Sequence, residues 1–136
     1  MDVLDTLILD KNDIKSLKVP KLQIVFSRLT RIFFCQKYPV MTSVTCVSLN
    51  NNKIDDLEAI VSQLSSFFPN VEVLSMLFNP CCPNIYVDPS AEDAYLRYRY
   101  YIIKTLKKLT ALDSLTITPQ EKKNADRVKK GGLDKV

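Results

Sequence analysis

One apolar spacing recurs along this chain of 136 residues and constrains its fold more than any other feature. The pattern L-x-x-L-x-L-x-x-N-x-I-x-x-L begins at Leu4 and, with Val at two of the Leu positions, again at Val44. A third copy runs from Val71 to Asn79, and a shorter fragment of the same frame starts at Leu109. Because the copies share both spacing and residue type, they indicate a repeat architecture in which each unit stacks on the next.

The spacing is the signature of the leucine-rich repeat. Its L-x-L core predicts a short strand that turns alternate side chains toward the core and toward a concave surface. The Asn that follows turns the chain, and its amide can pair backbone groups that the turn leaves without partners. We therefore predict a structural Asn ladder rather than a catalytic one, made of Asn12, Asn52 and Asn79.

These repeats predict an α/β fold, a short leucine-rich-repeat solenoid of about three to four repeats with a helical C-terminal cap. We place the repeat domain at 1–118, with the cap at 80–118, and a basic C-terminal helix and tail at 119–136. Residues 18–43 do not follow the repeat. Their apolar residues recur at helical steps, which favours a helical insertion over an irregular one or an extra strand at 29–34.

Helix start signals lie between the predicted strands. Asp55 and Glu58 form a capping box before a helix that Pro69 ends, and Ser90 with Asp93 forms another before the cap helix. The chain then returns as a strand over 109–115. Thr118 and Glu121 with Pro119 open a last, basic helix that we expect to reach Lys130.

Missing residue types argue against catalysis. The chain has no His and only two Gly, both near its C-terminus, so a common general base and phosphate-cradling loops are absent. Its four Cys lack the C-x-x-C spacing of a zinc site, and the adjacent Cys81 and Cys82 are better explained as small buried residues. We expect no enzyme activity, no catalytic residue, no cofactor and no metal. No apolar run is long enough for a membrane span.

Charge changes sign in blocks along the chain. Residues 18–43 carry five basic groups and no acid, 44–93 carry one basic and seven acidic groups, and 94–136 carry eleven basic and four acidic groups. This alternation is typical of a protein with distinct faces rather than of a uniform nucleic-acid binder.

The segment from Tyr98 to Thr118, YRYYIIKTLKKLTALDSLTIT, resembles the cap of one leucine-rich-repeat group. In that group a tyrosine-rich helix and an L-x-x-L-D motif seal the last repeat. The group includes the spliceosomal U2 A-prime protein, acidic nuclear phosphoproteins and axonemal proteins. The run PNVEVLSMLFNPCCPN, residues 69–84, is most similar to the melanocyte differentiation-associated members. Members usually have Gly before the last Asn, where this chain has Phe78.

The resemblance implies a non-enzymatic adaptor with a role in melanocyte differentiation and melanosome-related trafficking. It also implies protein partners such as a Rab-class small GTPase or a trafficking complex, and a cytoplasmic location with the nucleus as the alternative. The outward strand positions form the concave surface of a repeat protein. Our candidate protein-binding surface comprises Asp10, Ser48, Asn50, Val73, Ser75, Leu77, Phe78 and Asp113. We also weigh a packing role for Phe78 beneath the cap helix.

A nuclear RNA-associated scaffold of the U2 A-prime type is the alternative function. The lysines and arginines from Lys104 to Lys130 could meet phosphate beside the cap tyrosines. Nucleic acid is the less favoured partner, because aromatic residues at helical spacing usually belong to a core.

Overall fold

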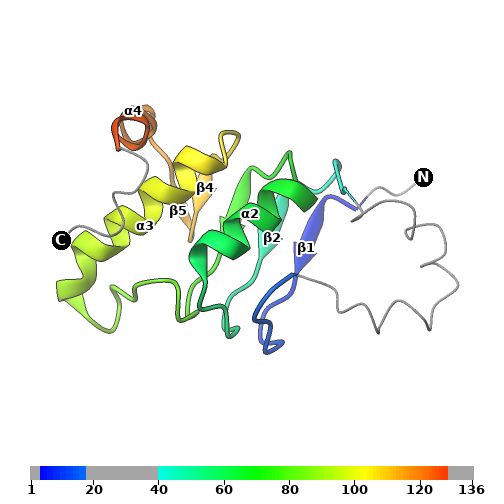
Figure 1. Ribbon diagram of the computed structural model, residues 1–136, viewed down its shortest axis with the longest axis horizontal. Helices are drawn as coiled ribbons and strands as arrows, with labels where there is room; N and C mark the ends of the chain where they lie inside the picture. The colour runs from blue at the N-terminus through cyan, green and yellow to red at the C-terminus, as the bar shows by residue number, and fades with distance from the viewer. Residues whose placement is uncertain (1–3, 18–39, 129–136) are drawn as a thin grey trace, which may run out of the picture.

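The computed structural model describes residues 4–17 and 40–128. In these ranges five short strands form one sheet in chain order (Figure 1). The strands are β1 (Thr6–Ile8), β2 (Cys46–Ser48), β3 (Val73–Ser75), β4 (Ala111–Leu112) and β5 (Leu115–Thr116). The helices are α2 (Leu57–Phe67), the 3-10 turn η2 (Pro89–Ala91), α3 (Glu92–Thr105) and α4 (Pro119–Arg127). The fold is mixed α/β, and β1 and α4 lie toward opposite ends of its long axis (Figure 1).

The register of the sheet follows the sequence repeat. Strands β1 to β4 are parallel, and Leu7 pairs with Val47, Val47 with Leu74, and Leu74 with Leu112. These are the same position in each copy of the motif, so equivalent residues form rows across the sheet. Val47, Leu74 and Leu112 are buried, while Leu7, on the first strand, is only partly buried. The core therefore lies on one side of the strands and is best covered from β2 onward.

Two of the three predicted ladder asparagines are buried. The Asn52 amide nitrogen donates to the carbonyls of Leu9 and Leu49, each at 2.9 Å. The Asn79 amide nitrogen donates to those of Leu49 and Met76, at 2.8 and 2.9 Å. Each side chain therefore joins its own turn to the preceding repeat.

Asn12 differs from its two counterparts because it lies in the first repeat. Its side chain is exposed and donates only to the carbonyl of Asp10, at 3.0 Å. Among the described residues no strand precedes β1, and this amide makes no hydrogen bond to an earlier repeat there.

Helix α2 covers the core with Ile60, Val61, Leu64 and Phe67. Its N-cap is Asp56, whose side chain accepts from the backbone N–H of Ala59 at 2.9 Å. The predicted cap at Asp55 was therefore wrong by one residue. Asp56 can cap because its own backbone is extended and its carboxylate reaches the free N–H groups of the first turn.

The cap helix also begins differently from the prediction. Asp88 accepts hydrogen bonds from both the backbone N–H and the hydroxyl of Ser90, at 2.9 and 2.6 Å, and starts the turn η2. Helix α3 continues directly from this turn with no side-chain cap of its own. Ser90 is therefore not the cap residue, since Pro89, with its fixed φ, begins the helical path one residue earlier.

A hairpin replaces the single strand predicted over 109–115. Strand β5 folds back antiparallel on β4, with Leu112 paired to Leu115. Asp113 and Ser114 have φ values of 52° and 67°, and two successive positive φ values favour a tight reversal between strands.

The last helix begins as the sequence predicted. In α4 the Thr118 hydroxyl accepts from the N–H of Glu121 at 3.1 Å, and Glu121 accepts from the N–H of Thr118 at 2.9 Å. This reciprocal capping box satisfies two backbone donors that a helix start leaves free. The helix ends at Arg127 because Val128 is extended, so the prediction that it reaches Lys130 was wrong. Most of the insertion predicted at 18–43 lies outside the described residues.

A partly buried ion pair joins helices α3 and α4. The Nε of Arg99 on α3 donates to Glu121 at 2.9 Å, and its Nη1 donates to the carbonyl of Leu112 at 3.1 Å. Arg99 is buried despite its charge, and it also lies over the ring of Tyr95 at 6.0 Å from the centroid. Tyr95 in turn stacks on Tyr98. The tyrosines of the cap motif therefore help to form the core at this end of the sheet.

Candidate functional site

The outward positions of the strands form one continuous surface, which we call the strand face. Its first row follows the pairing of Thr6, Cys46, Val73 and Ala111. Its second row pairs Ile8, Ser48 and Ser75. A third row lies two residues further along each repeat and consists of Asp10, Asn50 and Leu77.

The polar residues of the strand face bind one another across the strands. The carboxylate of Asp10 accepts from the hydroxyl of Ser48 at 2.7 Å and from the backbone N–H of Asn50 at 2.9 Å. One strand along, the amide oxygen of Asn50 accepts from the hydroxyl of Ser75 at 2.7 Å and from the N–H of Leu77 at 2.8 Å. The same geometry is thus made twice, one repeat apart.

We call this series of hydrogen bonds the Asp10 and Asn50 ladder, to distinguish it from the Asn ladder at the turns. It was not predicted from the sequence, although its signal is present there. Asp10 and Asn50 occupy the same repeat position, and so do Ser48 and Ser75. The ladder brings five of the eight predicted surface residues together and gives each polar one a defined partner. Leu77 ends it, because a leucine side chain cannot accept a hydrogen bond. Leu77 is partly buried and packs against the core, so it also stabilises the fold.

Two apolar side chains project from this polar array. Ile8 is 67 % exposed and Val73 is 40 % exposed, while their neighbours in the core-facing row are largely covered. Val73 belongs to the predicted set, whereas Ile8 does not. Exposed branched side chains on an ordered strand surface are ready to be buried by a partner.

Phe78 lies at the rim beside the strand face and adopts a costly backbone conformation. Its φ is 60°, a region that a bulky side chain rarely occupies, and the side chain is 50 % exposed. Lys11 and Asn51 occupy the equivalent position, with φ values of 59° and 55°. The turn of the repeat therefore requires this conformation whatever residue stands there. Half of the surface of Phe78 remains in solvent, so the residue is not simply a packing residue beneath the cap helix.

Asp113 does not belong to the surface on which we placed it. It is 0 % exposed, and its Oδ1 accepts from the backbone N–H of Met76 at 2.8 Å while Tyr95 donates its hydroxyl hydrogen to Oδ2 at 3.2 Å. The hairpin turn between β4 and β5 directs this carboxylate inward, where Cys82 also lies 3.9 Å from Oδ2. Burial is the largest influence on its pKa, which lies above the usual 3.8.

Acidic side chains predominate in and directly before the rows of the strand face, while exposed Lys11 lies at the rim after Asp10. Asp10 lies in the third row, and Asp5 and Glu72 are exposed at the residues directly before β1 and β3. Thr45 and Thr110 occupy the same position directly before β2 and β4. The backbone N–H groups of Thr45, Glu72 and Thr110 donate to the carbonyls of Asp5, Thr45 and Glu72, respectively. No Lys or Arg occupies these rows, although the chain as a whole carries a net charge of +4.

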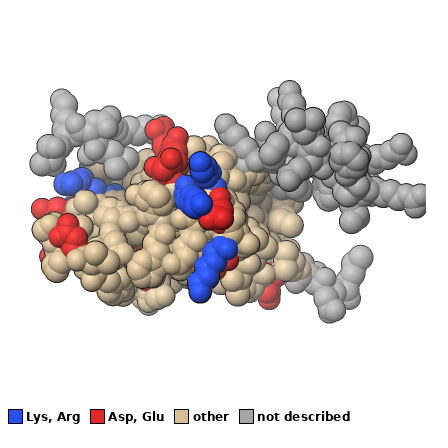
Figure 2. Space-filling model, turned by 90° about the horizontal axis from the view of Figure 1, so that it is seen from below, with Lys and Arg blue, Asp and Glu red and all other residues tan. Residues whose placement is uncertain are grey.

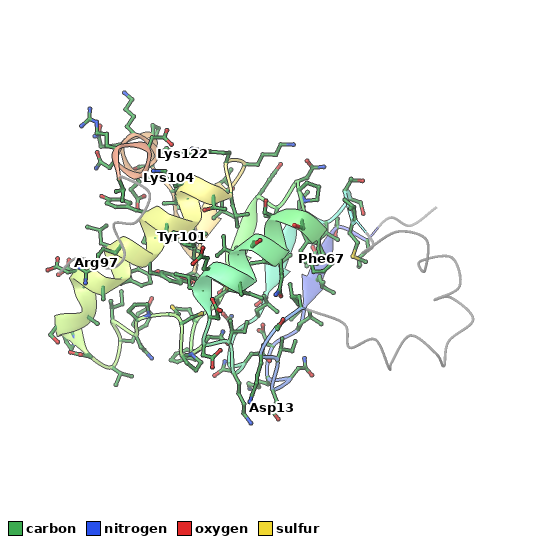
Figure 3. The ribbon with its side chains drawn as sticks, in the orientation of Figure 1. Asp13, Phe67, Arg97, Tyr101, Lys104 and Lys122 are labelled. Atoms are coloured by element: carbon green, nitrogen blue, oxygen red, sulfur yellow. The ribbon has the colours of Figure 1, made fainter. Side chains whose placement is uncertain are left out.

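The turn edge of the molecule has a different character. Asp13 marks this edge at the bottom of Figure 3, and Lys53 pairs with it at 3.0 Å. Seen from below, acidic and basic side chains lie side by side there among a broad uncharged surface (Figure 2). The predominance of acidic side chains at the strand face is therefore not a general property of the molecule.

Basic side chains gather instead on helices α3 and α4. Arg97, Tyr101 and Lys104 follow one another along α3, and Lys122 lies on α4 (Figure 3). Lys104 donates to the carbonyl of Val128, Lys107 pairs with Asp126, and Lys108 donates to the side chain of Asn70. These three lysines, which the RNA alternative would use, thus already have partners within the protein.

The described residues hold no group of three or more His, Cys, Asp or Glu side chains that could bind a metal ion. Within the same ranges, no helix combines the length and apolarity that crossing a bilayer requires.

No protein-family model matches the chain. It is similar to the human leucine-rich melanocyte differentiation-associated protein, with 36 % identity over 88 residues that cover 64 % of this chain and 44 % of that protein. It is also similar to the human cilia- and flagella-associated protein 410, with 30 % identity over 123 residues that cover 76 % of this chain and 43 % of that protein. The chain thus spans less than half the length of either relative.

Among solved structures, the Mex67:Mtr2 subunits of Chaetomium share the fold, with a TM-score of 0.50 at 21 % identity over 90 % of this chain and 62 % of that one. The SNF/U2A′ complex of Drosophila melanogaster gives a TM-score of 0.46 at 23 % identity, over 93 % of this chain and 71 % of that one. The predicted resemblance to leucine-rich-repeat proteins, and to the melanocyte differentiation-associated protein in particular, is confirmed.

Proposed function

We propose that this chain is a non-enzymatic protein-interaction module, a short leucine-rich-repeat solenoid closed by a helical cap, and that its strand face binds a protein partner. One observation carries the proposal. The polar residues of the face hold one another in place through the Asp10 and Asn50 ladder, while Ile8 and Val73 stay exposed beside it.

Such an arrangement favours binding for a physical reason. A side chain that is already fixed loses little conformational entropy when a partner covers it, so more of the contact energy contributes to affinity. Exposed Ile8 and Val73 add apolar area that a partner can remove from water. The similarity to leucine-rich-repeat proteins supports a repeat surface of this kind.

Affinity capture with paired variants tests the proposal. Ile8→Arg with Val73→Arg places bulky charges on the strand face. Leu96→Arg is the control, because Leu96 lies on α3 and its exposed fraction equals that of Val73. Quantitative mass spectrometry of proteins retained by each form should show a partner that the double variant loses and the Leu96→Arg control keeps. Equal retention by all three forms would remove the strand face as the binding surface.

The finer assignments rest on the resemblance. The name of the similar human protein favours a role in melanocyte differentiation. An adaptor role in melanosome-related trafficking, a Rab-class small GTPase as partner and a cytoplasmic or nuclear location stay proposals from the sequence resemblance alone. Tagging the full chain in pigment cells and mapping its neighbours by proximity labelling tests all three at once.

The RNA-associated alternative receives less support. Of the cap tyrosines, Tyr95 and Tyr98 are buried and cannot stack on bases, while Tyr100 and Tyr101 are partly buried. Lys104, Lys107 and Lys108 have partners within the protein. Binding to RNA through phosphates would show a steep dependence on salt concentration. A titration with single-stranded RNA at two salt concentrations therefore separates the two functions.

A further inference from the structure

We infer that the partner segment received by the strand face is a basic amphipathic helix, which carries Lys or Arg beside apolar residues spaced about two helical turns apart. This inference rests on the proposed function and deepens it, because it assigns a chemistry to the partner. It stands on three observations: the sign of the charges, the positions of the exposed apolar side chains, and the hydrogen bonds that the polar groups already make within the protein.

The first observation is the charge. Asp10 lies in the rows of the strand face, and exposed Asp5 and Glu72 directly precede its first row on β1 and β3. Exposed Lys11 lies at the rim after Asp10, so these three carboxylates outnumber the neighbouring cation. A positively charged partner would be steered toward this surface, whereas an acidic segment or a phosphate backbone would be repelled. The carboxylates of Asp5 and Glu72 are exposed, so a partner can reach them.

The second observation is the geometry of the apolar pair. Ile8 lies on β1 and Val73 on β3, two strands apart, and they occupy adjacent rows of the face. Two strand spacings across and two residues along correspond to roughly 12 Å. Residues seven or eight apart on an α-helix are separated by roughly 11–12 Å along its axis. A helix that crosses the strands diagonally can therefore set one apolar side chain against each.

The third observation concerns hydrogen bonds. The Oδ1 of Asp10 and the Oδ1 of Asn50 each already accept two hydrogen bonds, from Ser48 or Ser75 and from the backbone. The face thus has little to offer the free N–H and C=O groups of an extended peptide. A helix satisfies its own backbone groups and needs only side-chain contacts. The observations therefore favour a helical segment over an extended one.

The charges and the apolar pair also reinforce each other. Asp5 and Asp10 flank the strand that carries Ile8, and Glu72 directly precedes Val73. Each apolar contact thus has a carboxylate nearby, and a partner helix with Lys or Arg next to its apolar residues would satisfy both at once.

A set of three designed peptides tests the inference with the full chain. All three are helical, have the same length and carry Leu at two positions seven residues apart, and the flanking residues are Lys, Glu or Gln. Amide chemical shifts of the isotopically labelled protein report which strands each peptide contacts. We expect the Lys peptide to bind most tightly, to shift residues of β1 to β3, and to lose affinity as salt concentration rises.

A charge-removing variant locates the effect. Asp5→Asn with Glu72→Gln should weaken binding of the Lys peptide by about three- to tenfold at low salt, the scale of two exposed charge pairs. The matched control is Glu58→Gln with Asp93→Asn, which removes two acids from the exposed surface of α2 and α3 and should leave the affinity unchanged.

Opposite results are equally informative. Tighter binding of the Glu peptide to the same strands, or of a single-stranded RNA oligonucleotide, would overturn the charge preference while leaving the strand face as a binding surface. Shifts confined to helices α3 and α4, equal losses in both variants, or no binding by any peptide would overturn the inference as well. The capture experiment with Ile8→Arg and Val73→Arg does not depend on peptide charge, so it tests the proposed function separately.

Discussion

The side chain of Asn52 accepts the backbone N–H of Asn12 at 2.9 Å, so a buried asparagine of one repeat completes the turn of the repeat before it. The same oxygen also accepts from the N–H of Ile14 at 3.0 Å. Asn12 and Asn52 thus occupy the same motif position but have different roles. The side chain of buried Asn52 accepts hydrogen bonds from the backbone of the first repeat, and the backbone N–H of exposed Asn12 is one of the donors.

Alanine substitution should separate these roles. Asn52→Ala would leave backbone groups of both repeats without partners, and we expect the free energy of unfolding to fall by about 3 kcal/mol. Asn12→Ala removes one exposed hydrogen bond and should cost less than about 1 kcal/mol. Urea unfolding of both variants measures the difference, and equal losses would show that the Asn ladder does not act through burial.

Phe78→Gly should stabilise the protein. A non-glycine residue in the left-handed region costs about 1–2 kcal/mol, and the unfolded-state entropy of Gly offsets about half of that gain. We therefore expect a net rise of about 0.5–1 kcal/mol in the free energy of unfolding. The matched control is Phe78→Ala, which removes the ring but keeps the backbone cost and should not stabilise. A loss of stability with Gly would mean that the buried half of the ring contributes more than the strain costs.

Breaking the ion pair of the cap should be expensive from one side only. Arg99→Leu removes a buried cation that binds both Glu121 and the carbonyl of Leu112, and we expect a loss of about 3 kcal/mol. Glu121→Gln keeps an acceptor for the N–H of Thr118 and should cost clearly less. A double-mutant cycle by thermal unfolding gives the coupling energy, and a value near zero would contradict a direct role for the pair.

The buried carboxyl of Asp113 should give the protein a characteristic pH dependence. Its pKa in the folded state lies above the usual 3.8, so the folded protein holds this proton more tightly than the unfolded chain does. The contribution of this group to the free energy of unfolding is therefore greatest below pH 3.8 and is lost as pH rises through the raised pKa. The difference in stability between the native protein and Asp113→Asn, measured by urea unfolding at a series of pH values, should fall over that range. A difference that rises with pH would reverse the sign of the linkage.

The adjacent thiols should react slowly. Burial, as the largest influence, raises the pKa of Cys81 to about 11 and that of Cys82 to about 12, and nearby Asp113 adds to both shifts. Because the thiolate is the nucleophile, alkylation by iodoacetamide at pH 8 should be slow at both positions and slower at Cys82. Peptide mass spectrometry measures each rate, with the protein in urea as the control. Rapid alkylation of the folded protein would contradict the burial of Cys82 and the half-burial of Cys81.

The repeat motif predicted much of what the strands do. Val47, Leu74 and Leu112 hold the same motif position, so stacked repeats place them in one row of the core. The motif also predicted the buried face, because residues two apart share a face of a strand. It also predicted that Asn52 and Asn79 would serve backbone groups at the turns. The Asp10 and Asn50 ladder was equally visible as a repeat of polar residues, but its hydrogen bonds could be recognised only once the register was known.

The errors cluster where distant segments meet. Asp113 was predicted at the surface because a continued strand would turn it outward. Two positive φ values reverse the chain there and direct it beneath α3 instead. Arg99 was expected on the cap helix without any sign that it would be buried, since its partners Glu121 and Leu112 come from other elements.

The sequence by itself determined the strand spacing, the inward and outward alternation and the asparagine turns, because these depend on local periodicity and backbone geometry. Only the tertiary structure decided which polar groups are buried and which apolar groups stay in solvent. Asp113 and Arg99 are enclosed because α3 and α4 pack over the last strands, whereas Ile8 and Val73 remain free because no described element covers the strand face. Burial is a property of all the segments that surround a residue, and a local pattern contains only one of them.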